Sequence, residues 1–260
     1  MSIVINNIHK SFKDNHVLHG IGFEFETGEV NMIIGASGSG KSVTMKIMVG
    51  LLQPDRGFVS YEGQRLHEMT PKQMRELRKQ LGMLFQSGAL FDSMTLEENV
   101  GFPLRMFTKM TAKEKQHRIE EVLEQVELKG NNKLFPAELS GGMKKRAGLA
   151  RAIVMHPKYL FADEPNSGLD PKTGDVIDEL VRTLTYEYNT TTIVITHDIK
   201  SVLNIGDKIL FIYQGRKAWQ GSRDDVRGAE NEHLQDFIQT SGLMQQRRAH
   251  EGDMDQHLAD

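Results

Sequence analysis

Short apolar runs alternate along the 260 residues with segments that repeat apolar residues at helical spacing. Four of these runs have the length and composition of buried strands, and turn or capping signals separate them from the helical segments. This alternation predicts an α/β fold. The four runs are Val30–Ile34, Tyr159–Ala162, Thr192–Thr196 and Ile209–Tyr213.

A different pattern surrounds the first of these strands. Ile3–Ile8 and Ile21–Phe25 alternate apolar and polar residues, as half-exposed antiparallel strands do. Phe58–Tyr61, followed by a Glu-Gly pair, is consistent with the same group. We therefore expect a small antiparallel sheet beside the main one.

Helix starts are marked by capping residues. Thr70 with Pro71, and Thr111 with Glu114, have the spacing of capped helix N-termini, and Asp170 before a proline opens another helix. The last of these helices is predicted to bury Val176, Ile177, Leu180, Val181 and Leu184. A further helix is expected at Val43–Leu51. Residues 88–140 form a mostly helical block within a helical subdomain at about 88–155.

Composition excludes several classes of function. The chain has no cysteine, which rules out disulfides and thiolate metal sites and fits a reducing compartment. It shows neither a secretory leader nor an apolar run approaching the ~18 residues that cross a bilayer, so we expect any membrane role to act through a partner. The net charge of −3 argues against a dedicated nucleic-acid binder. The basic run 144–146 is expected to be the solvated face of a helix.

A phosphate-binding motif follows the first buried strand. Residues 35–42 match G-x-x-x-x-G-K-[ST] between a strand and a helix. The glycines let consecutive backbone N–H groups and the helix N-terminus face phosphate oxygens. Lys41 supplies a compact charge to the β- and γ-phosphates of a nucleoside triphosphate, and Ser42 offers a hydroxyl to Mg²⁺. The predicted nucleotide-binding residues are Gly35, Ala36, Ser37, Gly38, Ser39, Gly40, Lys41, Ser42 and Val43.

Polar residues also follow the other strands. Asp163 can hold Mg²⁺ through a water, and Glu164 is placed one residue nearer the γ-phosphate to polarise an attacking water. His197 could bond the γ-phosphate or orient Glu164. Gln86 could offer its amide oxygen to Mg²⁺ and its amide nitrogen to the water. Taken alone, a histidine at a strand end and a glutamine in a loop are also typical of ordinary surface positions.

The order of these motifs, with a Leu-Ser-Gly-Gly-Met turn at 139–143 between them, resembles that of the ABC-type ATPases. The resemblance covers about residues 3 to 240 and is carried by the phosphate loop, Gln86, Leu139–Met143, Asp163, Glu164, Ser167–Asp170 and His197. It implies an ATPase that uses ATP and Mg²⁺, with Glu164, His197, Lys41 and Gln86 as catalytic residues. It also implies a RecA-like mixed-sheet core at residues 1–240 with a small antiparallel β subdomain and a helical subdomain.

The same resemblance assigns roles to residues outside the phosphate loop. Phe12 would stack on adenine, although it could instead be a strand residue in the core. The family forms head-to-tail homodimers. In such a dimer Ser140, Gly141 and Gly142 of one subunit would close on the γ-phosphate held by the other, and Asp170 would lie at the seam.

Two segments, 84–104 and 136–152, resemble the ATPases of Mla/Mce-type phospholipid transporters. Met143 stands where most ABC ATPases carry glutamine, whereas Asn166 departs from the usual Thr or Ser. This resemblance implies a peripheral subunit on the cytoplasmic face of the inner membrane, bound to an integral permease and an Mce-domain protein. The helical block after Gln86 would contact a cytoplasmic helix of that permease. The polar tail 241–260 is expected to be flexible or to contact a partner.

Other functions remain open. The nearest alternative is an ABC transporter ATPase for another substrate. Among soluble ABC ATPases, repair enzymes need a long coiled-coil insertion that 260 residues cannot hold, and translation factors usually carry two cassettes. Length does not exclude an iron–sulfur assembly ATPase, which only the Mla/Mce-like segments disfavour.

Overall fold

The computed structural model describes residues 2–241, so the expectations for the polar tail at 245–260 lie outside it. Its centre is a six-stranded sheet in the order β10-β9-β3-β8-β7-β6, parallel except for β10, which runs antiparallel to β9. The four predicted buried strands are present as neighbours in this sheet. The strands are β3 (Val30–Ile34), β6 (Leu81–Leu84), β7 (Tyr159–Asp163), β8 (Thr191–Thr196), β9 (Lys208–Tyr213) and β10 (Arg216–Gly221).

The smaller sheet is antiparallel, as the alternating pattern predicted. Its order is β2-β1-β4-β5, and Ile3 pairs with Phe25 on one side and with Tyr61 on the other. Its strands are β1 (Ile3–Phe12), β2 (Asn15–Phe25), β4 (Arg56–Tyr61) and β5 (Gln64–Arg65).

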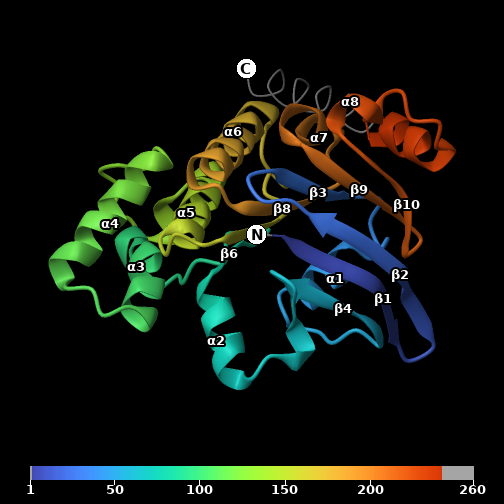
Figure 1. Cartoon of the computed structure of the whole chain (residues 1–260). Helices are drawn as coiled ribbons and strands as arrows, with labels where there is room; N and C mark the ends of the chain where they lie inside the picture. The colour runs from blue at the N-terminus through green and yellow to red at the C-terminus, as the bar shows by residue number, and fades with distance from the viewer. Residues whose placement is uncertain (1, 242–260) are drawn as a thin grey trace, which may run out of the picture.

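The helices divide between the main sheet and a block beside it. α3 and α4 extend to one side of the molecule, and α5 lies between them and the sheet (Figure 1). The helices are α1 (Lys41–Met48), α2 (Pro71–Lys79), α3 (Leu96–Phe107), α4 (Ala112–Gln125), α5 (Gly141–Ile153), α6 (Pro171–Tyr188), α7 (Ile199–Ile205) and α8 (Arg223–Val226). Within residues 2–241, no helix combines the length and the apolar character needed to span a bilayer.

Local sequence accounts for the helix boundaries. The capping boxes at Thr70 and Thr111 are formed as predicted, each threonine side chain accepting from the backbone N–H three residues on. α1 begins at Lys41, two residues earlier than predicted, and its last turn gives way to Gly50, whose φ of 73° ends the helical path. β6 has only four residues, one of them a glycine, so it does not stand out from the sequence.

The predicted buried stripe of α6 was partly wrong. Val176 is 37% exposed, whereas the carboxylate-bearing Asp178 is only 3% exposed. Asp178 takes this inward position because polar groups of α7 and of the turn after β7 meet it there. Ile177, Val181 and Leu184 are buried as expected.

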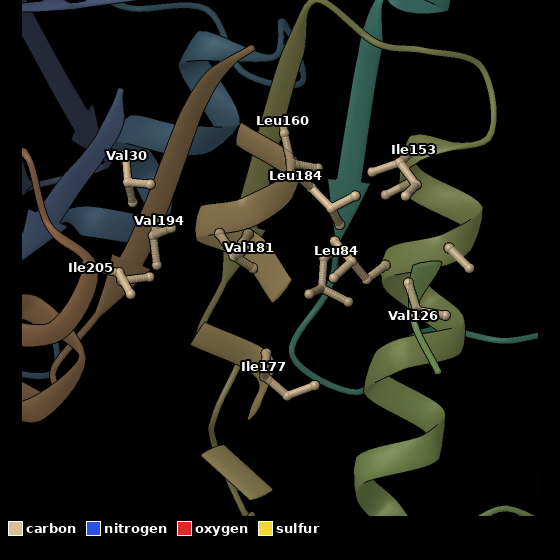
Figure 2. Close-up of a cluster of buried hydrophobic side chains, with 14 of the residues drawn as sticks. Val30, Leu84, Val126, Ile153, Leu160, Ile177, Val181, Leu184, Val194 and Ile205 are labelled. Atoms are coloured by element: carbon tan, nitrogen blue, oxygen red, sulfur yellow. The ribbon is translucent and has the colours of Figure 1, made fainter. Parts of the chain in front are cut away.

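Alternate residues of β3, the central strand, belong to two different hydrophobic cores. Val30, Met32 and Ile34 belong to the cluster shared with α3 to α7, and Ile33 belongs to the cluster shared with α1 and the small sheet. Figure 2 shows side chains of α6 gathered with Leu160 and Val194 from the sheet. Because β3 packs against apolar side chains on both faces, the end of the strand, where the phosphate loop begins, is held in place.

Arg118 joins the helical block to the end of α5. It is buried on α4, and its guanidinium donates to the carbonyls of Ile153 (3.0 Å) and Val154 (3.0 Å), with Glu121 2.9 Å away as an ion-pair partner. The carbonyls at a helix C-terminus have no partner within the helix. Arg118 therefore satisfies the end of α5 where water cannot reach.

We expect Arg118→Met to lower the free energy of unfolding by about 2–3 kcal/mol, because two buried carbonyls lose a charged donor. Chemical denaturation measures the change. Arg182→Met is the matched control, since its pair with Glu179 is largely exposed and contributes less than about 0.5 kcal/mol. Equal losses in the two variants would contradict the capping role.

Candidate functional site

Four parallel strands deliver the candidate site residues to one edge of the main sheet. Leu84 pairs with Ala162, Asp163 with Ile195, and Ile34 with Thr196, so β6, β7, β8 and β3 end side by side. Loops that follow the carboxyl ends of such strands form the usual binding crevice of open α/β sheets. The segments that follow these strands begin at Gly35, Phe85, Glu164 and His197.

The phosphate loop needs its glycines for two different reasons. Gly35, Gly38 and Gly40 have φ values of 148°, 78° and 108°. At Gly35 a Cβ would lie 2.3 Å from the carbonyl oxygen of Ile212, and at Gly40 it would lie 2.5 Å from Leu18. The loop is thus pressed against β9 and β2 in a conformation that only glycine adopts without strain.

Lys41 is buried at the centre of this loop. Its ammonium donates to the carbonyl oxygens of Gly35 (2.7 Å) and Ala36 (2.9 Å). Burial lowers the pKa of Lys41, and the charges of Glu164 and Asp163 oppose that shift. The loop therefore holds a cation beside its own N–H groups, which is the arrangement that binds a polyphosphate.

Glu164 is held by two of the other predicted residues. Its Oε1 lies 3.0 Å from His197 Nδ1, and its Oε2 accepts from Gln86 Nε2 at 3.3 Å. Because an ionised carboxylate only accepts, Nδ1 of His197 carries the hydrogen in this contact. The backbone is fixed too: the N–H of Glu164 donates to Ile195 at 2.9 Å, and its φ is +46°, a left-handed conformation.

The residues predicted to hold Mg²⁺ offer suitable oxygen atoms. Gln86 donates through its amide nitrogen to Glu164 and to Ser167, which leaves its carbonyl oxygen for a cation. Burial raises the pKa of Asp163, as does Glu164, while Lys46, Lys41 and Lys145 lower it. Oxygen donors from Ser42, Gln86 and Asp163 fit Mg²⁺, which usually takes a few protein ligands together with substrate phosphates. When bound, the ion neutralises phosphate charge.

The prediction that residues 144–146 form a solvated face is wrong for Lys145. Its side chain is 5% exposed, and its ammonium donates to the backbone carbonyl of Glu164 at 3.1 Å. Burial lowers the pKa of Lys145. Helical periodicity gives the reason, because Lys145 lies three residues from both Gly142 and Gly148, which are buried. Because the sequence does not show which face of α5 is buried, no signal in it distinguished Lys145 from its basic neighbours.

The Ser-Gly-Gly turn is buried at Gly142 and exposed at Ser140 and Gly141. Ser140 caps α5 by accepting from the N–H of Met143 at 3.3 Å. A Cβ on Gly142 would lie 2.5 Å from Thr173, and one on Gly141 would lie 3.4 Å from Leu169. These residues therefore face the start of α6, and the structure does not bring them to the phosphate loop of the same chain.

Asp170 and Phe12 occupy exposed positions. Asp170 caps α6 by accepting from the N–H of Thr173 at 3.0 Å, and hydrogen bonds from Thr173 lower the pKa of Asp170. Phe12 ends β1 with 44% of its surface exposed, so the alternative of a core strand residue is wrong. The Lys10 ammonium lies 5.6 Å from its ring centroid. Stacking of Phe12 on adenine stays a prediction.

Sequence reasoning also missed how the loop after Gln86 is anchored. Arg151 on α5 donates to the carbonyls of Gly88 (2.9 Å) and Ala89 (2.7 Å). A Cβ on Gly148 would lie 3.3 Å from the Cα of Gly88, so the loop and the helix are in close backbone contact. α5 therefore contacts both the Gln86 loop and, through Lys145, the Glu164 turn.

Comparison with known proteins now identifies the cassette. The sequence model of the ABC transporter family matches residues 18–167. The chain belongs to the ABC transporter family. Members of this family carry an ATP-binding domain, and the family match identifies the chain as an ATP-hydrolysing cassette.

Two curated relatives align with most of the chain. The "probable ribonucleotide transport ATP-binding protein mkl" of Mycobacterium tuberculosis is 37% identical over 238 residues, covering 92% of this chain and 66% of the relative. The chain thus spans 66% of that relative's length. The "intermembrane phospholipid transport system ATP-binding protein MlaF" of Haemophilus influenzae is 34% identical over 236 residues, 91% of this chain and 89% of the relative. The MlaF relative supports the resemblance to Mla/Mce-type ATPases.

A solved cassette confirms the fold. The dimeric ATP-binding cassette MJ0796, in a post-hydrolysis state bound to ADP and Pi, superposes with a TM-score of 0.77 at 30% identity. The match covers 85% of this chain and 98% of that cassette. The predicted α/β, ABC-type fold is therefore correct.

We expect Lys145→Met to lower kcat for ATP about tenfold, equivalent to about 1.4 kcal/mol of barrier, while the Kd for ATP changes little. The Glu164 turn loses its donor, whereas the phosphate loop is untouched. Steady-state hydrolysis and nucleotide titration measure the two quantities. Lys144→Met, at the neighbouring and more exposed position, should resemble the wild type. Equal activity in both variants would rule out support of Glu164 by Lys145.

Proposed function

We propose that the chain is the ATP-hydrolysing subunit of an ABC transporter that moves phospholipid through a membrane permease, as in Mla-type lipid-asymmetry systems. The observation that carries the catalytic part is the Glu164 carboxylate, held between His197 and Gln86 at the sheet edge that bears the phosphate loop. The MlaF relative, which aligns over 89% of its own length, supports the transport part.

In the proposed reaction Glu164 accepts a proton from the water that attacks the γ-phosphate. Gln86 and His197 fix the two carboxylate oxygens, so that Glu164 does not reorganise as the proton moves. Lys41 and the N–H groups of the phosphate loop stabilise charge on the transferred phosphoryl group. Ser42, Gln86 and Asp163 would hold Mg²⁺.

The proposed working form is a head-to-tail homodimer. The first turn of α5 exposes Ser140 and Gly141, so its N–H groups are available to a phosphate held by a second subunit. Asp170, also exposed, would lie at the seam. The solved neighbour is dimeric, which supports this arrangement.

Mixing two inactive variants tests the dimer. Lys41→Ala removes the phosphate-loop cation, and Ser140→Arg blocks the first turn of α5, so each variant alone should be inactive. In a head-to-tail heterodimer one site keeps both intact halves, so an equimolar mixture should recover about a quarter of wild-type ATPase activity. A mixture as inactive as its components would show that Ser140 does not serve the partner's nucleotide.

A groove beside the catalytic edge is the proposed docking site of the permease. It has a volume of about 320 Å³ and lies between the β6 edge and the helical block. Phe85, Phe91 and Phe107 line it and are exposed. Arg78 and Lys79 add positive charge. An amphipathic cytoplasmic helix of a permease would cover these apolar side chains.

This arrangement makes the chain a peripheral subunit on the cytoplasmic face of the inner membrane. A permease and an Mce-domain protein are its proposed partners, and nucleic acid is not. The competing proposals are transport of another substrate, for which the name of the ribonucleotide-transport relative gives a specific candidate, and a soluble role in iron–sulfur assembly.

We expect the affinity-tagged full chain to recover a multi-span membrane protein from solubilised membranes. Phe107→Glu should abolish this recovery. A charge placed in the groove opposes docking of an apolar helix. Leu51→Glu changes another exposed apolar residue, one that does not line the groove, and should retain the partner. Both variants should bind ATP normally.

The recovered wild-type complex also tests the substrate. Phospholipid in the complex by mass spectrometry, together with ATPase activity stimulated by phospholipid vesicles, would support the proposal. Stimulation by ribonucleotides instead would identify the competing substrate. Recovery of iron–sulfur proteins from the soluble fraction, with no membrane protein, would refute transport.

A further inference from the structure

A closed set of buried polar contacts lies behind the catalytic edge. We call it the Asp178 network, formed by Asn166, Asp178 and Ser201. Asn166 Nδ2 donates to Asp178 Oδ1 and to Ser201 Oγ, both at 2.7 Å, and the Ser201 hydroxyl donates to Asp178 Oδ2 at 2.7 Å. Two side chains, one from the turn after β7 and one from α7, therefore satisfy the Asp178 carboxylate of α6.

The network is costly to bury. Asp178 and Ser201 are almost wholly inaccessible, and Asp178 is the one charged residue among the buried residues of α6, most of which, such as Ile177 and Val181, are apolar. An apolar side chain would have packed α6 at lower cost, because a buried carboxylate loses its hydration. The retained charge therefore calls for a role other than simple packing.

Each segment that the network joins carries a residue of the candidate site. Asn166 follows Glu164 by two residues, α6 begins directly after Asp170, and Ser201 lies one helical turn beyond His197. The 3.0 Å contact between His197 and Glu164 connects the turn after β7 to the start of α7. The contact between Asn166 and Ser201 connects the same two segments. The network thus fixes the distance between the turn after β7 and the start of α7.

The hydrogen-bond pattern depends on the charge of Asp178. Both amide hydrogens of Asn166 and the hydroxyl hydrogen of Ser201 are used, so each contact to Asp178 is made by a donor. A protonated Asp178 would bring a fourth hydrogen into this set and break one contact. The buried Oδ1 of Asn166, which has no hydrogen-bond partner, could then accept that hydrogen if the amide turned over.

We propose that Asp178 is a positioning residue for ATP hydrolysis: in its ionised form it holds the Glu164 turn against the His197 segment through Asn166 and Ser201. This inference rests on the proposed ATPase function. It assigns a role to Asn166, at the position where this chain departs from the Thr or Ser of many ABC ATPases.

Surrounding charges set the pH range in which the network acts. Burial raises the pKa of Asp178 to about 6, Ser201 and Asn166 oppose the shift as donors, and Asp198 and Asp175 add to it. Lys200 on α7 is paired with Asp175 on α6 at 2.6 Å. Asp178 is ionised above pH of about 6 and protonated below it, so the network should weaken as pH falls through that value.

The same shift separates stability from activity. The folded protein holds the Asp178 proton more tightly than the unfolded chain does, so the free energy of unfolding falls as pH rises from the ordinary aspartate pKa of 3.8 to about 6. Asp178→Asn removes the buried charge and keeps the shape of the side chain. A variant with a melting temperature no lower than the wild type but slower hydrolysis would identify positioning rather than folding as the role.

The test uses the full chain, in complex with its permease where turnover requires it. We expect Asp178→Asn and Ser201→Ala to lower kcat about tenfold at pH 8 with an unchanged Kd for ATP. The ratio of wild-type to Asp178→Asn kcat should then fall toward one as pH is lowered below 6. Asp175→Asn breaks the other, exposed contact between α6 and α7 and should resemble the wild type.

Two results would overturn the inference. One is wild-type kcat and pH dependence in Asp178→Asn. The other is a joint loss of kcat, ATP affinity and melting temperature, which would mark the network as purely structural. Failure of the proposed function looks different: the wild-type chain itself would then hydrolyse ATP no faster than Lys41→Ala.

Discussion

The alignment of β7 with β8 is the constraint on which the candidate site depends. Pairing of Asp163 with Ile195 brings the N–H of Glu164 to the Ile195 carbonyl, and the residues that follow the two strands, Glu164 and His197, then meet. A shift of one residue between these strands would separate that pair by more than 3 Å. The apolar side chains that pack on both faces of the sheet resist such a shift, so the packing of the core also fixes the geometry of the candidate site.

α5 is the element that connects this edge to the rest of the molecule. One side of it anchors the Gln86 loop through Arg151, another supports the Glu164 turn through Lys145, and Arg118 closes its C-terminus from α4. Close packing between Gly148 and Gly88 leaves no space for α5 to shift relative to the Gln86 loop. The helical block and the sheet edge are therefore joined by directed polar contacts in addition to apolar packing.

Motif spacing and strand periodicity were sufficient to predict four of the six strands of the main sheet, the small antiparallel sheet and the loops that converge at the sheet edge, and the resemblance carried by the motifs implied the ABC-type fold. They could not predict contacts made by side chains that cross between elements. Lys145 belonged to a basic run that was expected to be solvated, and Asp178 was not among the residues predicted to be buried on its helix. Tertiary partners decided otherwise: a carbonyl of the Glu164 turn for Lys145, and Asn166 with Ser201 for Asp178. A core position for Phe12 stayed open as the alternative to stacking, because strand periodicity does not show where a strand extends beyond the packed core.

The left-handed backbone of Glu164 has a consequence for how this chain can vary. A residue with a side chain is disfavoured at a φ of +46°, and glycine is the residue type that relieves the strain. Glycine carries no carboxylate. Selection for a more stable fold and selection for hydrolysis therefore oppose each other at this one position. A descendant that had lost its need for ATP turnover would be free to gain stability there, so glycine at position 164 in an otherwise intact cassette would mark one that binds nucleotide without consuming it.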